Sequence, residues 1–186
     1  ESYYDLYSMF LASSGELQWA TRYSFAATVL AESRTGHPES TFSISHLSRH
    51  LMESNEFRSA MNLLDEKRAY LAERGNSRGW VNYNIARCHF GLQEFDEAII
   101  NYLEASQSNI SDADILLSSQ VGLYYSYLKI GDDKLAAKHK KKAQEMAKST
   151  GFEAVWKEPA TLPSGSTHSS GNWKISKRAV SWSNAI

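Results

Sequence analysis

Four alanines recur in this chain at an almost constant interval. Each lies about five residues after a turn-forming segment, and they are 40, 38 and 38 residues apart: Ala20, Ala60, Ala98 and Ala136. Three residues before the alanine stand Leu17, Phe57, Phe95 and Asp133. A repeated supersecondary unit constrains a fold more than any single element does, because each unit has to bury its apolar face against its neighbours. We therefore expect four structural repeats.

The repeats are predicted to be helical. All three prolines stand at positions 38, 159 and 163, so residues 1–37 and 39–158 contain nothing that must break a helix. Apolar residues recur there at helical spacing. Segments rich in Gly, Ser, Asn and Asp divide this region into about eight helices, and they lie at 13–15, 35–38, 75–77, 108–112, 131–133 and 150–151. The sequence thus predicts an all-α fold of about four helical hairpins over residues 1–158.

The third unit has the clearest pattern along its second helix. In FDEAIINYLEA a small residue, a large residue and another small residue follow one another as Ala98, Tyr102 and Ala105. This pattern resembles the tetratricopeptide repeat, in which small residues mark the tight crossings between helices. The fourth unit matches as well, with Leu123, Tyr127, Gly131, Ala136 and Ala143 in corresponding places. The resemblance covers about 150 residues and implies an α-solenoid.

The chain departs from the family pattern in two ways. The first two units are degenerate, and Lys67 stands in the second unit where the third has Ala105. The period of 38–40 residues also exceeds the usual period of roughly 34. We expect a longer-period variant with longer helices or loops. In the last unit Lys140 replaces the large residue Tyr102, which is typical of a capping helix.

The resemblance implies a concave groove lined by the first helix of each unit, where arrays of this kind hold partner segments. The predicted groove residues are Phe42, Arg49, Met52, Trp80, Tyr83, Arg87, Phe90, Val121, Tyr125 and Leu128. Arginine together with tryptophan and tyrosine is typical of interaction hot spots. Some of these aromatic residues could instead pack between helices. The Lys, Asn and Arg clamp that grips acidic chaperone tails in the family is absent at the corresponding positions, which argues against a cochaperone of that kind.

The C-terminal part has a different composition. Residues 159–172 are rich in Pro, Ser, Gly and Thr and are predicted to form a flexible linker. Residues 173–186 form a basic, aromatic segment with Trp173, Ile175, Val180 and Trp182, and the chain after residue 158 carries a charge of +3 against −4 before it. We expect this segment to dock on an array, in its own molecule or in a neighbour. The alternatives are a disordered tail or a tethered partner sequence.

The sequence does not favour catalysis or a bound metal. His46 and His50 are spaced as two metal ligands on a helix would be, but no third ligand or general base accompanies them. We expect ordinary surface or groove histidines, and we expect the single cysteine, Cys88, to be a small buried hydrophobe. No glycine-rich phosphate loop and no recognisable nucleophile–base arrangement is present. The prediction is a protein without enzymatic activity and without cofactors.

Charge and hydropathy narrow the class of partner. The net charge of −1, from 20 basic and 21 acidic residues, gives no general attraction to nucleic acid or to an anionic membrane. No apolar stretch of membrane-spanning length and no signal peptide is recognisable, so we expect a cytoplasmic protein. The chain begins with Glu1, which suggests part of a longer protein.

The predicted function is a scaffold or adaptor module that binds a protein or peptide. The alternative is a regulatory domain of a larger, bacterial-type regulator whose output domain is absent here.

Overall fold

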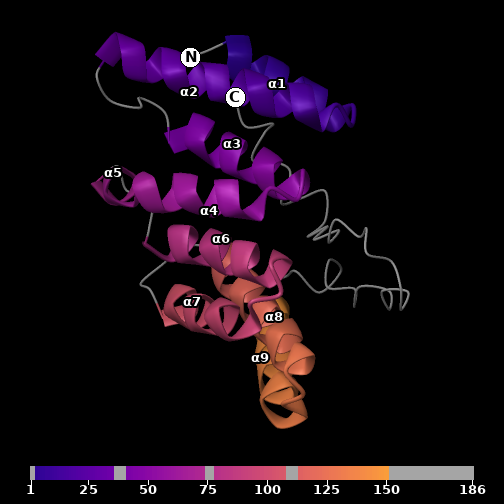
Figure 1. The fold of residues 1–186 in the computed structure, drawn as a ribbon. Helices are drawn as coiled ribbons and strands as arrows, with labels where there is room; N and C mark the ends of the chain where they lie inside the picture. Colours follow the sequence, from indigo (N-terminus) through magenta and orange to yellow (C-terminus); the bar gives the residue numbers. More distant parts are fainter. Residues whose placement is uncertain (1–2, 36–40, 74–77, 108–112, 151–186) are drawn as a thin grey trace.

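The computed structural model describes residues 3–35, 41–73, 78–107 and 113–150, and every regular element in these ranges is a helix (Figure 1). The helices are α1 (Tyr3–Ser13), α2 (Leu17–Thr35), α3 (Thr41–Glu53), α4 (Phe57–Glu66), α5 (Arg68–Glu73), α6 (Arg78–Gly91), α7 (Phe95–Gln107), α8 (Ala113–Lys129) and α9 (Asp133–Thr150). The predicted all-α fold is confirmed. The predicted linker and docking segment, residues 159–186, lie outside the described residues.

The helices pack in consecutive pairs. Each hairpin joins a first helix to a second helix: α1 to α2, α3 to α4, α6 to α7, and α8 to α9. The second helix then packs on the first helix of the next hairpin, so that α2 contacts α3, α4 contacts α6, and α7 contacts α8. Figure 1 shows the resulting stack, with α1 and α2 at one end and α8 and α9 at the other. This is a tetratricopeptide-like solenoid, in which each unit contacts its neighbours.

The four recurring alanines mark the crossings of these helices. Each lies in the first turn of a second helix and is at most 1% exposed. Ala60 belongs to an apolar cluster with residues of α3 and α6, and Ala98 to one with residues of α6 and α8. A larger side chain at such a position would force the packed helices apart. The period seen in the sequence is therefore a period of close helix contacts.

The second unit is built differently at Lys67. Its second helix stops at Glu66 and resumes as α5 at Arg68, so the described residues contain nine helices where about eight were expected. The Lys67 ammonium lies 2.7 Å from a carboxylate oxygen of Glu32 in α2 and 2.9 Å from one of Glu66. These carboxylates raise the pKa of Lys67. A long cationic side chain does not fit a tight crossing, and here it contacts the preceding unit instead.

The four turns inside the hairpins share one backbone geometry. One residue in each turn has a positive φ: 85° at Gly15, 62° at Asn55, 63° at Gln93 and 81° at Gly131. The following residue donates its N–H to a carbonyl five residues earlier, as in the 2.9 Å bond from Glu94 to His89. These contacts close a Schellman motif, which ends the first helix in the left-handed conformation. The motif recurs five residues before each of the four alanines.

Replacing Gln93 with glycine should stabilise the chain. Gln93 is exposed, and a residue with a Cβ loses about 1–2 kcal/mol in the left-handed conformation. Glycine avoids this cost but loses more entropy on folding, which leaves an expected net gain of about 0.5–1 kcal/mol. Urea denaturation of Gln93→Gly would measure the gain. The reverse change at the equivalent turn, Gly131→Gln, should lower the midpoint, and a lower midpoint for Gln93→Gly would contradict the expected result.

Candidate partner-binding surfaces

Two of the predicted groove residues, Arg49 and Arg87, occupy equivalent positions on α3 and α6, 38 residues apart. The Arg49 side chain is about half exposed and has its Nε 4.0 Å from a carboxylate oxygen of Glu53. The guanidinium carbon of Arg87 lies 5.8 Å from the centre of the Tyr83 ring, and its Nη1 donates a 3.2 Å hydrogen bond to the side-chain oxygen of Asn84. Stacking on the ring fixes the direction of the Arg87 side chain.

The Nε–H groups of both arginines are buried and have no hydrogen-bond acceptor in the described part of the chain. A buried donor without an acceptor costs roughly 1–3 kcal/mol. Guanidinium groups pair well with carboxylates and carbonyl oxygens, because their planar donors can bond two acceptor atoms at once. These buried Nε–H groups are closed to an external acceptor, which would have to bond the terminal amino groups of the two guanidinium groups.

The predicted aromatic residues on α6 are half-buried. Trp80 packs against the apolar cluster that joins α3 and α4 to α6, while Tyr83 and Phe90 pack against the cluster formed with α7 and α8. The Tyr83 ring centre lies 6.0 Å from that of Tyr102, which is buried. Each of the three predicted side chains thus contributes to the core on one side and keeps part of its surface accessible on the other.

The remaining predicted groove residues are less uniform. Met52 is buried in the cluster with Leu47, Leu51, Ala60 and Cys88, so it is not available to a partner. The side chain of Phe42 lies outside the described part of the structure. On α8, Val121 packs half-buried against α9, and Leu128 is exposed. Tyr125 is half-buried, with its ring centre 4.7 Å from that of Tyr124.

His46 and His50 are buried, which corrects the expectation of surface or groove histidines. Their ring centres are 6.1 Å apart, and Nδ1 of His50 lies 3.1 Å from the hydroxyl of Ser24 in α2. Burial, followed by the charge of Arg49, lowers the pKa of each histidine to about 4. His50 lies where α3 meets the preceding unit. No group of three potential ligands able to hold a metal occurs among the described residues.

Cys88 is fully buried in the core, as predicted. Burial raises the pKa of its thiol to about 12. A thiol with such a pKa stays protonated at neutral pH, and the thiolate is the nucleophilic form. Cys88 therefore acts as a packing residue of α6.

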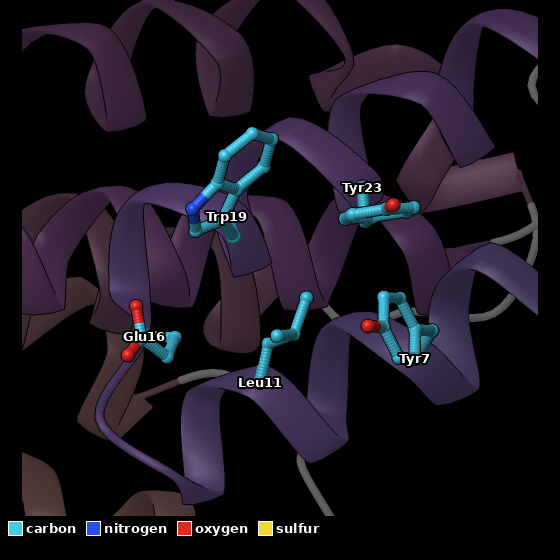
Figure 2. Close-up of a pocket in the computed structure, with 5 residues that line it drawn as sticks. All are labelled: Tyr7, Leu11, Glu16, Trp19 and Tyr23. Atoms are coloured by element: carbon cyan, nitrogen blue, oxygen red, sulfur yellow. The ribbon is translucent and has the colours of Figure 1, made fainter.

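A surface that the sequence did not reveal lies on the first hairpin. Here α1 exposes Tyr3, Tyr4, Leu6, Tyr7 and Phe10, and α2 exposes Trp19. We call these six residues the N-terminal aromatic face. Figure 2 shows Tyr7 and Leu11 on one side of a recess and Trp19 and Tyr23 on the other, with Glu16 at its edge.

The N-terminal aromatic face contains two adjoining recesses. The one in Figure 2 has a volume of about 410 Å³, and a second, of about 510 Å³, is lined by Tyr3, Tyr4, Tyr7 and Tyr23. The rings of Tyr7 and Tyr23 meet edge to face, with centres 4.8 Å apart. Such ring contacts hold aromatic side chains in fixed orientations. The face is thus an ordered apolar surface. Among the described residues, no helix has both the length and the apolar composition needed to cross a membrane.

Comparison with known proteins supports the fold. No family model matches the sequence, and no curated protein matches it. The crystal structure of BtubC (BKLC) from P. vanneervenii is similar, with a TM-score of 0.67 and 17% sequence identity over 86% of this chain and 68% of BtubC. A structure of MamA AMB-1 aligns with a TM-score of 0.47 and 19% identity over 83% of this chain and 97% of that one, a similarity too low to support an argument. The likeness to BtubC concerns the fold alone.

Proposed function

We propose that this chain is a non-enzymatic scaffold that binds a segment of a partner protein along its first helices α3, α6 and α8. The observation that carries the proposal is the arrangement on α6, where Arg87 stacks on Tyr83 and its guanidinium group is thereby held in one direction. Arg49 repeats the basic position one unit earlier, and its side chain is about half exposed. Two equivalent basic positions on neighbouring first helices suit a partner segment that runs along the stack.

The chemistry of these residues defines the partner. Arg49 and Arg87 would bind carboxylates or backbone carbonyl oxygens, because guanidinium groups offer several donors in one plane. Trp80, Tyr83 and Phe90 would contact apolar side chains of the same segment. Tryptophan, tyrosine and arginine supply much of the binding energy in protein interfaces, since they bury a large area for few ordered torsions. The expected partner segment is therefore acidic and apolar in composition.

The double variant Arg87→Glu with Tyr83→Ala should lose the partner while the fold remains helical. Affinity capture with the 186-residue chain, followed by identification of the captured proteins, provides the partner, and titration of that partner then measures binding. Removing a hot spot costs about 2 kcal/mol or more, so binding should weaken at least about 30-fold. Lys141→Glu reverses an exposed charge on α9 and serves as the matched control. Undiminished binding by the double variant would contradict the proposed site.

A further inference from the structure

Four exposed apolar residues of α1 stand at positions that are buried in the equivalent first helices α3, α6 and α8. Offsets of 40, 78 and 116 residues, taken from the recurring alanines, relate α1 to α3, α6 and α8. The equivalents of Tyr3 are Ser43, Val81 and Ser119; those of Leu6 are His46, Asn84 and Gly122; those of Tyr7 are Leu47, Ile85 and Leu123; and those of Phe10 are His50, Cys88 and Ser126. All twelve equivalents are buried, whereas Tyr3 is 89% and Phe10 63% exposed.

The twelve equivalents lie on first helices that are covered by the second helix of the preceding hairpin. Ser24 of α2 lies within hydrogen-bond distance of His50 of α3, and the ring of Tyr102 in α7 lies directly over Gly122 of α8. No described helix covers α1 in this way. The N-terminal aromatic face is therefore a junction surface, of the kind by which one unit of the solenoid packs on another, rather than part of the predicted groove.

We propose that the N-terminal aromatic face binds the same face of a second copy of this chain, forming a two-fold dimer. The six side chains are between 39% and 89% exposed. At roughly 100 Å² each they present about 600 Å² per copy, or about 1,200 Å² in all, which falls within the range of specific interfaces. An apolar surface of about 600 Å² lies at the upper end of what a typical monomer exposes, and patches of this size are often functional.

The charge distribution favours a contact between two identical faces. Asp5 is the one charged residue of α1, and it is buried and accepts a 2.8 Å hydrogen bond from the hydroxyl of Ser43. The exposed side of α1 therefore carries no charge, so two copies meet without like-charge repulsion. Glu16, just before α2, lies at the edge of the recess, and the Arg22 guanidinium of α2 lies 4.9 Å from the Trp19 ring centre. The edge thus offers one charge of each sign.

The opposite end of the stack does not suit such a contact. The position that Tyr102 occupies in the junction between α7 and α8 is held in α9 by Lys140. Stacking α9 of one copy on α1 of another would bury this ammonium group against apolar rings, and burying a charge in an apolar contact is costly. Association through the N-terminal aromatic face alone uses the same surface on both partners, so it closes at two copies and does not continue into a filament.

Sedimentation equilibrium of the 186-residue chain tests the dimer. We expect a dimer with a dissociation constant below about 100 µM. The double variant Leu6→Glu with Phe10→Glu should weaken self-association at least about 100-fold. Ile100→Glu is the matched control, because Ile100 is an exposed apolar residue of α7 whose equivalents, Arg22, Asn62 and Lys138, are exposed as well. Circular dichroism would establish that both variants stay helical.

Three results would overturn the proposal. A wild-type chain that remains monomeric would rule out the dimer and leave the N-terminal aromatic face to a partner other than a second copy. A dimer that persists in the Leu6→Glu, Phe10→Glu variant would place the contact elsewhere. Loss of the dimer on deletion of residues 173–186, with no effect of the double variant, would assign it to the C-terminal segment.

Discussion

Acidification from pH 7 to pH 4 should destabilise the folded chain by roughly 5 kcal/mol through His46 and His50. Each has a pKa of about 4 in the folded chain and about 6.5 when unfolded. Below pH 6.5 the unfolded chain therefore binds protons that the folded chain does not bind. The contribution of the two histidines to the free energy of unfolding is fully present above pH 6.5, and it is lost as the pH falls from 6.5 toward 4. Lowering the pKa from 6.5 to about 4 corresponds to roughly 3 kcal/mol for each histidine.

Urea denaturation at a series of pH values would measure this loss. The double variant His46→Gln with His50→Gln removes both titrating groups, so its unfolding free energy should change much less between pH 7 and pH 4.5. Its stability at neutral pH will also be lower, because His50 loses its contact with Ser24. The informative quantity is therefore the slope with pH. Equal slopes for the variant and the wild-type chain would show that other groups cause the acid sensitivity.

Replacing Gly122 with alanine should destabilise the chain by about 2 kcal/mol. A Cβ at this position of α8 would overlap the ring of Tyr102, which is buried and cannot move away freely. Overpacking of this kind costs about 1–3 kcal/mol, occasionally more. Alanine is intrinsically better than glycine inside a helix by about 1 kcal/mol. The sign of the measured change therefore shows whether packing or helix propensity dominates.

A double-mutant cycle identifies the cause. In a chain that carries Tyr102→Leu, the ring is absent and Gly122→Ala should cost much less, or even stabilise the helix. Urea denaturation of the four chains gives the coupling energy between the two positions. If alanine raises the midpoint in the wild-type background, the close contact between α7 and α8 is not as tight as the structure indicates.

The parts of the fold that depend on local sterics could be predicted from the sequence. The alanine period and the turn segments predicted the hairpins, because a tight helix crossing needs a small residue at a fixed distance from the turn. The division of the second unit into α4 and α5 was missed, although Lys67 had been recognised as a departure. In the structure Lys67 contacts Glu32, which stands 35 positions earlier in the sequence, and sequence spacing does not show that contact.

The surfaces were harder to predict, because a helical pattern shows which residues a helix is built to bury and not what covers them. His46 and His50 looked like surface residues since they are polar, yet both are buried, and His50 lies against Ser24 of α2. Leu6 and Phe10 follow the same pattern on α1, where no described helix covers them. Met52 illustrates the same limit in the groove, as a shift of one residue around the helix separates a core position from an exposed one.

Packing between successive neighbours also determines the mechanics of the array. The main contacts join helices that are close in the sequence, and the first hairpin has no such contact with the last. Small rotations at successive junctions between hairpins therefore add up along the array. The superhelical pitch of the whole array can change in this way without breaking any single contact. A rigid ligand that spans several hairpins would hold that pitch at one value, and would resist stretching of the chain between its two ends.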